Sequence, residues 1–150
     1  MELNDEILIS APVATVYAAL NDPAILQECI PGCEELIKHS DTELEAKVTL
    51  KVGPVKAKFA GNVVLDTAGA PDQFSLTGAG NGGVAGFAKG GADVVLEEVD
   101  GQTLLKYTAK AEIGGKIAQL GSRLMTSTAK KLAGKFFARF AEIVDETQTA

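Results

Sequence analysis

The feature that most constrains the fold is a long segment with helical periodicity, from about Lys116 to Glu146, which follows residues that are mostly strand-like. Its bulky apolar residues recur at intervals of three and four, the pattern of one helix face. They are Ile117, Leu120, Leu124, Met125, Leu132, Phe136 and Phe140. Gly121 and Thr128 fall in the same stripe, although a helix that only sealed a core would rarely carry them there. We therefore expect one long helix whose apolar face borders a cavity at these two positions, although tight contact with the sheet would explain them equally well.

The residues before this helix predict an antiparallel sheet. Apolar and polar residues alternate with a period of two, most clearly in 43–52, 55–66 and 102–113, so each strand should have one apolar face. The connection at Gly53-Pro54 is too short for the crossover that parallel neighbours need, so the strands should form hairpins. The expected strands are 3–10, 33–38, 43–52, 55–66, 73–78, 92–99 and 102–113.

Two short helices are expected after the first strand. Ser10 is the candidate N-cap of the first, with Pro12 near its first turn. The run Asn21-Asp22-Pro23 breaks that helix and can cap the second. The predicted order is therefore one strand, two short helices, six strands and one long helix.

The chain should form a single α+β domain. Its length of 150 residues is typical of one domain with its own core. We assign residues 1–146 to this domain and expect 147–150 to be a frayed C-terminal tail. A helix of about 30 residues is roughly 45 Å long, enough to cross a whole sheet and cover its dry face.

Charge is distributed unevenly along the sequence. The net charge of −6 argues against nucleic acid as a partner, because phosphate binding needs a cationic surface. Residues 116–139 nevertheless contain six cations and no carboxylate, which leaves −12 for the rest. This basic helix face either pairs with acids of the sheet or docks onto an anionic membrane or protein surface. In the second case Lys130, Lys131 and Lys135 are the candidate interaction face.

No export signal or membrane span is recognisable. Residues 1–6 are acidic where a signal peptide would be basic, and no run of about 18 apolar residues occurs. We expect a cytoplasmic protein, with peripheral contact at the inner face of the membrane left open. Cys29 and Cys33 should then be reduced thiols. With His39 as the one histidine, the sequence offers too few ligands for zinc, and we expect no metal.

Two local motifs do not predict catalysis. Residues 78–83 match G-x-G-x-x-G, but the residues that follow are too rich in glycine to begin the helix that a dinucleotide site needs. We expect either a flexible or bulged hairpin tip, or a mobile gate at a cavity mouth with Val84 and Phe87 as its bulky apolar residues. His39 falls in an expected turn, where it is a poor candidate for a catalytic triad. No catalytic residue is assigned, and a small cyclase-like or hydrolase-like enzyme is kept as a third possibility.

The sequence resembles a known family over about residues 2–145. Cys29-Ile30-Pro31-Gly32-Cys33 is similar to the Cys-x-Pro-Gly-Cys turn of the CoxG family, which is named for the G subunit of carbon monoxide dehydrogenase. Residues 10–17, 51–54 and 78–91 are similar to that family as well. The order of the elements resembles the helix-grip fold of the START, Bet v 1 and polyketide-cyclase superfamily (SRPBCC). The resemblance implies a curved antiparallel sheet of about seven strands wrapped around the C-terminal helix.

The resemblance also implies a function. Members of the CoxG family are accessory proteins beside molybdenum hydroxylases of the carbon monoxide dehydrogenase type, and the superfamily binds lipophilic molecules between sheet and helix. We expect a quinone or lipid in such a cavity, no other cofactor, and molybdenum hydroxylase subunits as partners. Many relatives carry a hydrophobic C-terminal anchor. This sequence ends at Ala150 without one, so we expect peripheral membrane contact at most.

The candidate ligand-binding residues combine the apolar helix stripe with inward strand positions and the glycine-rich segment. They are Phe59, Leu76, Val84, Phe87, Tyr107, Leu120, Gly121, Leu124, Met125 and Thr128. The Tyr107 hydroxyl is the candidate group for orienting a ligand carbonyl. The alternative is an assembly or interaction protein with a filled core and no ligand, which docks through the basic helix or through the turn at Cys29–Glu35.

Overall fold

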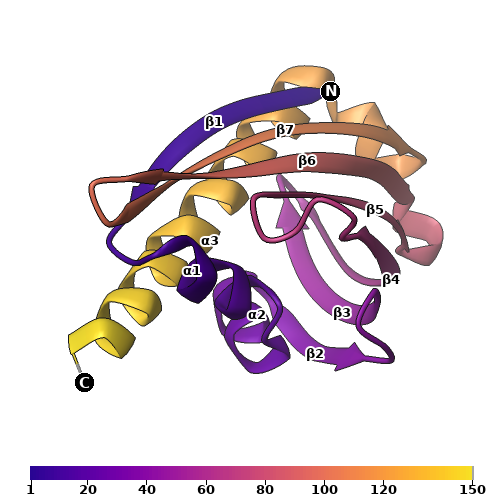
Figure 1. Cartoon of the computed structure of the whole chain (residues 1–150). Coiled ribbons are helices and arrows are strands. Elements are labelled where there is room, and N and C mark those ends of the chain that lie inside the picture. The colour runs from indigo at the N-terminus through magenta and orange to yellow at the C-terminus, as the bar shows by residue number, and fades with distance from the viewer. Residues whose placement is uncertain (150) are drawn as a thin grey trace.

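The computed structural model describes residues 1–149, and it shows one curved antiparallel sheet gripping a long helix (Figure 1). The strands are β1 (Glu2–Ile9), β2 (Cys33–Lys38), β3 (Glu43–Val52), β4 (Val55–Asp66), β5 (Gln73–Asn81), β6 (Phe87–Val99) and β7 (Gln102–Gly114). The α-helices are α1 (Val13–Leu20), α2 (Pro23–Cys29) and α3 (Ser122–Thr149), and two 3-10 helices are η1 (Gly83–Ala85) and η2 (Lys116–Leu120). This confirms the predicted helix-grip fold.

The seven strands lie in the order β1-β7-β6-β5-β4-β3-β2, each antiparallel to its neighbours. The register explains why one face is dry. Leu44 pairs with Val63 and Val48 pairs with Phe59, so apolar positions of β3 and β4 fall side by side on one face. That face is the one that α3 crosses in Figure 1.

The long C-terminal helix is shorter than predicted, because the backbone changes direction at Gly121. Gly115 and Gly121 both have a positive φ, of 82° and 101°, and η2 lies between them. The first hydrogen bond of α3 runs from the Met125 N–H to the Gly121 carbonyl. Gly121 is therefore a backbone hinge between η2 and α3 and not a position in the helix stripe. The expected tail at 147–150 is helical as far as Thr149, and Ala150 lies outside the described residues.

The short helices follow the prediction only in part. Ser10 is not the cap of α1, because Pro12 occupies the N-cap position in an extended conformation and no side chain caps the helix. For α2 the prediction is confirmed. The Asp22 carboxylate accepts a hydrogen bond of 2.9 Å from the Ala24 N–H, and Pro23 stands in the first turn.

The glycine-rich segment 78–91 is mostly strand, which corrects the expectation of a long flexible tip. Strand β5 extends to Asn81 and β6 begins at Phe87, because Gly78 and Gly80 pair in register with Gly90 and Ala88. Only residues 82–86 form the connecting turn.

The core is divided into two clusters. The larger lies where α1 and the C-terminal half of α3 meet β6 and β7, and it includes Ile9, Val16, Leu96, Leu105, Phe140 and Val144. The smaller cluster joins the β3–β4 turn to η1, η2 and the start of α3. It is formed by Val52, Ala85, Ile117 and Met125, with Leu120 and Leu124 packed against them. The space between these clusters is the candidate site. No helix within residues 1–149 has both the length and the apolar character needed to cross a bilayer.

Candidate functional site

A cavity of about 600 Å³ lies between the dry face of the sheet and α3, and it is partly open to solvent. Its lining is almost entirely apolar. The helix side is formed by Met125, Thr128, Ala129, Leu132 and Phe136. The sheet side comes from β3, β4, β5, β6 and β7, so the middle of the whole sheet contributes.

The floor of the cavity is a patch of residues with side chains no larger than methyl. One row across the sheet runs Ala46, Gly61, Gly80, Ala88 in register. The next contains Gly78, Gly90 and Ala111, and a third contains Ala92 and Ala109. All of these residues line the cavity. Bulky side chains stand only at the ends of these rows, at Val63, Leu76 and Ile113, so the middle of the floor leaves a volume that α3 does not fill.

Gly90 and Gly80, both in the floor, differ in whether the backbone requires glycine. A Cβ built at Gly90 would lie 2.1 Å from the Lys110 carbonyl oxygen, so this position must be glycine for the strands to approach closely. A Cβ built at Gly80 would meet only the Ala60 carbonyl oxygen, at 3.8 Å. Gly80 is therefore not required by the backbone, and its missing side chain simply enlarges the cavity.

The two core clusters form the end walls. Phe136 stands at one end and stacks on the buried Phe140, with ring centroids 6.0 Å apart. Phe59, Ile117 and Met125 stand at the other end. The ends are thus held rigid by packed side chains while the middle is hollow.

The Cys-x-Pro-Gly-Cys turn forms part of the lining. Gly32 has a φ of 76°, and a Cβ there would lie 2.1 Å from the Thr49 carbonyl oxygen, so only glycine fits. The Gly32 carbonyl also accepts a hydrogen bond of 2.9 Å from the Thr49 N–H on β3. This docking places Ile30 and Pro31 against the cavity. From the sequence this turn was interpreted as a feature of the family and as a possible docking surface, and its place in the cavity lining was not expected.

The two thiols that flank this turn are poor nucleophiles. Cys29 is buried in the larger cluster, and its burial raises the pKa to about 11, with Glu28 adding to the shift and Arg139 opposing it. Burial also raises the pKa of Cys33. Its thiol donates a hydrogen bond to the Glu35 carbonyl. Both cysteines are free thiols, and at neutral pH they carry their protons.

Four of the predicted ligand-binding residues line the cavity. They are Phe59, Leu76, Met125 and Thr128. Leu120 and Leu124 pack in the smaller cluster beside it, and Gly121 is the hinge described above. None of these last three lines the cavity.

The other three predicted residues lie elsewhere. Val84 projects from η1 and is 95% exposed, while Phe87 is half-exposed against Gly114. Tyr107 stacks on Phe137, with centroids 5.4 Å apart, beside a separate groove of about 570 Å³ between β1 and α3. Burial, and then the charge of Asp5, raise the Tyr107 pKa. Its hydroxyl is therefore not placed to orient a ligand in the main cavity.

The residues that sequence reasoning missed are those of the floor. The hollow was expected on the helix, at Gly121 and Thr128, whereas it is made by the sheet. A signal was available, because Gly78, Gly80 and Ala88 occupy alternate positions where bulky apolar residues stand in the other strands.

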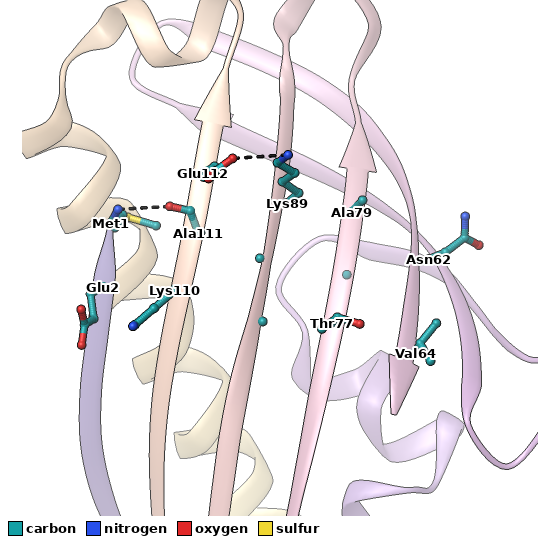
Figure 2. Close-up of a pocket in the computed structure, with 13 residues that line it drawn as sticks. Met1, Glu2, Asn62, Val64, Thr77, Ala79, Lys89, Lys110, Ala111 and Glu112 are labelled. Carbon is teal, nitrogen blue, oxygen red and sulfur yellow. Dashed lines mark hydrogen bonds and ion pairs between the residues drawn. The ribbon is translucent and has the colours of Figure 1, made fainter. Parts of the chain in front are cut away.

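The outer face of the same strands carries a second, shallower hollow of about 880 Å³ (Figure 2). Its rim holds an ion pair between Lys89 and Glu112, 3.4 Å apart, with both side chains largely exposed to solvent. The N-terminal amine of Met1 donates a hydrogen bond of 3.1 Å to the Ala111 carbonyl beside it. An exposed ion pair of this kind contributes little energy. Because this depression is more open and more polar than the inner cavity, the inner cavity is the stronger candidate for ligand binding.

The described residues offer no cluster suited to acid–base or metal chemistry. None of their His, Cys, Asp and Glu side chains gather in groups of three that could hold a metal ion. His39 lies in an exposed turn, as predicted, with its ring 3.1 Å from Glu45. Every buried side-chain N or O atom of residues 1–145 has a hydrogen-bond partner. Thr128 supplies a hydroxyl to the inner lining, while Asn62, Lys89 and Lys110 border the cavity from strand positions whose side chains project from the outer face (Figure 2).

Comparison with known proteins is consistent with this geometry. A sequence model of the family of the G subunit of carbon monoxide dehydrogenase (CoxG) matches residues 6–145. The chain belongs to this family. No match to this CoxG family member was found among curated proteins.

Solved structures share the fold. A conserved protein from Geobacillus kaustophilus is 30% identical, with a TM-score of 0.91, and the match covers 98% of this chain and 97% of that one. A START superfamily protein from Mycobacterium smegmatis is 13% identical, with a TM-score of 0.71 over 97% of this chain and 98% of its own. The Zhui aromatase/cyclase from Streptomyces sp. R1128 is 11% identical, with a TM-score of 0.71 over 97% and 93%. The last two show the fold alone.

Proposed function

We propose that this CoxG family member is a non-catalytic accessory protein of a carbon monoxide dehydrogenase-type molybdenum hydroxylase system, and that it holds a lipophilic ligand, a quinone or a lipid, between the sheet and α3. The observation that carries the proposal is the apolar cavity of about 600 Å³ with its floor of glycine and alanine. Membership of the family of the G subunit of carbon monoxide dehydrogenase supports the proposed association with such a hydroxylase.

The size and lining of the cavity suit such a ligand. Small-molecule sites have volumes of roughly 300–1,000 Å³ and are mainly apolar, with a few polar groups that fix orientation. Here the Thr128 hydroxyl is the polar group that α3 adds to the lining. It replaces Tyr107 as our candidate donor to a ligand carbonyl.

A catalytic role is not supported by any side-chain cluster of the described residues. The lining contains no carboxylate, histidine or cysteine, and the side chains of its two lysines, Lys89 and Lys110, project from the outer face. The raised pKa values of the Cys29 and Cys33 thiols make the nearby cysteines poor nucleophiles. The aromatase/cyclase neighbour shares a fold on which different functions occur.

A graded set of variants at Gly80 tests the ligand. Gly80→Leu would place a side chain in the cavity where a Cβ has room, and Gly80→Ala would add one methyl. Thr77→Leu is the control, because Thr77 is on the same strand but on the outer face and does not line the cavity (Figure 2). The assays are native mass spectrometry of the purified protein and titration with a short-chain quinone against a fluorescent lipophilic probe.

We expect a co-purifying or titratable lipophile. Gly80→Leu should weaken binding by about tenfold or more, since overfilling an occupied volume costs about 1–3 kcal/mol. Gly80→Ala should have a smaller effect and Thr77→Leu none. If the unmodified protein binds no lipophile in either assay, or if Gly80→Leu binds as well as Thr77→Leu, the ligand proposal fails.

A second candidate function is assembly of the hydroxylase through α3. Lys130, Lys131 and Lys135 are exposed and have no ion pair among the described residues, whereas Arg139 pairs with Glu28 and Glu142. These three lysines are suited to an acidic surface of a hydroxylase subunit. Reversing all three charges should weaken pull-down of that subunit, and unchanged pull-down would remove this role. In either case we expect the protein to act in the cytoplasm.

A further inference from the structure

One end of the molecule combines unpaired cations with a fully exposed apolar side chain. We call it the basic tip and define it as residues 51–56, 82–87 and 114–124. The three segments are in contact. A Cβ built at Gly53 would lie 3.0 Å from the Leu124 side chain, and η1 contacts η2. The smaller core cluster lies beneath them and fixes their relative positions.

The basic tip has four cations and no carboxylate. Lys51, Lys56, Lys116 and Arg123 are all exposed, and none forms an ion pair with another described residue. The whole chain has a net charge of −6, so the remainder has −10. The tip is thus a strongly positive end on an acidic protein.

The positions of Lys51, Lys56 and Arg123 are unfavourable for the stability of the isolated chain. Lys51 and Lys56 stand directly opposite each other across the β3–β4 hairpin, where like charges are destabilising. Arg123 lies in the first turn of α3, an end of the helix that favours anions, and that turn contains no acid. A carboxylate at any of these positions would improve the isolated fold. An anionic partner outside the chain gives the cations a role.

The apolar component is Val84 at the apex of η1, which is 95% exposed. The turn that carries it is anchored. Ala85 and Gly86 are buried, and the Gly82 N–H donates a hydrogen bond of 2.8 Å to the Gly86 carbonyl. The turn therefore presents a valine to solvent on a fixed support, with the half-exposed Phe87 next to it.

We propose that the basic tip docks on an anionic lipid bilayer, with Val84 inserted among the headgroups and the four cations on lipid phosphates. A cationic surface with an apolar residue at its centre is the chemistry that interfacial binding needs. The face of α3 that carries Lys130, Lys131 and Lys135 has no such apolar residue, because none of the large exposed apolar residues lies on α3 within 122–145. That face is better suited to a protein.

The membrane-docking proposal and the ligand proposal concern adjacent parts of the molecule but are independent of each other. Ile117 and Met125 belong both to the cluster beneath the tip and to the cavity lining. Docking by the tip would bring this end of the cavity toward the membrane. Vesicle binding is nevertheless measured without any cavity ligand, and probe displacement is measured without vesicles, so either proposal can fail alone.

The test is sedimentation or flotation of the full chain with vesicles of phosphatidylcholine alone and of phosphatidylcholine mixed with phosphatidylglycerol, at low and high salt. We expect binding to the mixed vesicles that salt weakens. Lys56→Glu and Lys116→Glu should each weaken it by about fivefold or more. Val84→Asp should weaken it by roughly tenfold, through lost insertion and added repulsion. The matched control is Lys130→Glu combined with Lys131→Glu and Lys135→Glu, which should bind vesicles nearly as the unmodified protein does.

Misfolding can be separated from loss of docking. Lys56→Glu places a carboxylate opposite Lys51, so its melting temperature should not fall even though vesicle binding does. The proposal is overturned if the unmodified chain ignores anionic vesicles, or if the tip variants bind them unchanged. It is also overturned if the α3 control loses binding while the tip variants keep it, because the cations of α3 would then be the membrane contact.

Discussion

The two halves of α3 pack against the same sheet but meet different kinds of residue. The C-terminal half meets large side chains, and Phe140, Leu105 and Ile9 are each about 1% exposed or less. The N-terminal half faces the rows of glycine and alanine, and its side chains border a cavity. The helix is continuous across both halves, so the difference originates in side chains, mainly the glycines and alanines of the sheet together with the small Thr128 and Ala129 of α3.

This difference shows how one domain can be stable and hollow at once. The large cluster, which includes α1 and Val144, provides the dense packing that holds the helix in place. The small cluster clamps the other end of α3 through Met125. The floor between them is then free to lack side chains, because neither end depends on it.

The largest expected effect is at the filled end. Phe140→Ala would remove a fully buried ring that stacks on Phe136 and leave a void in a packed region. We expect a loss of about 3–5 kcal/mol in the free energy of unfolding, as for other buried aromatic truncations. Chemical denaturation followed by far-UV circular dichroism measures it. A loss below about 1 kcal/mol would mean that this end is not the structural anchor.

Truncation of a side chain to alanine at the hollow end should reduce the free energy of unfolding by less. Leu132 is on α3, two turns before Phe140, and borders the cavity. Its side chain already lacks neighbours on one side, so less packing is lost, and we expect Leu132→Ala to cost about 1–2 kcal/mol. A cost equal to that of Phe140→Ala would show that the cavity is closed up in solution.

The sequence predicted the architecture well because the fold depends on periodicity and turn chemistry. The bounds of β3 and β4, the cap at Asp22 and the order of the elements all follow from alternation, proline and a capping carboxylate. The helix start was wrong because bulky residues at Ile117 and Leu120 maintain helical spacing through η2, while the backbone turns at Gly121.

The site was harder to predict than the fold. A cavity floor is a property of neighbours across strands, and the pairing of Gly61 with Gly80 and of Gly78 with Gly90 is set by register. Read along the chain, Gly80 and Gly90 indicated a flexible or bulged hairpin tip or a mobile gate. Tyr107 was misplaced for a related reason. Alternation gives the correct face of β7, but it does not show on which side of α3 the ring lies.

The buried thiol of Cys29 should make the stability of the filled end depend on pH. Cys29 has a pKa near 11 in the folded protein, raised from 9.0 by burial. Its contribution to stability is therefore complete below about pH 9 and is lost as the pH rises toward 11, because the unfolded chain releases the proton first. We expect the stability of Cys29→Ala to fall less between these pH values than that of the unmodified protein. An identical alkaline decline in both proteins would show that Cys29 is not the group responsible.

The smallest predicted effect is a gain in stability at the cavity floor. Gly80 does not require a positive φ, and a Cβ there has open space, so Gly80→Ala should stabilise the fold by about 0.4–1 kcal/mol through the unfolded chain. Gly90→Ala is the matched control on the neighbouring strand, where the added Cβ would clash with the Lys110 carbonyl and should destabilise the sheet. Melting temperatures of the two variants give the comparison. If both variants destabilise, Gly80 is held by the backbone as Gly90 is, and the hollow floor is then a consequence of sheet geometry and not of a missing side chain.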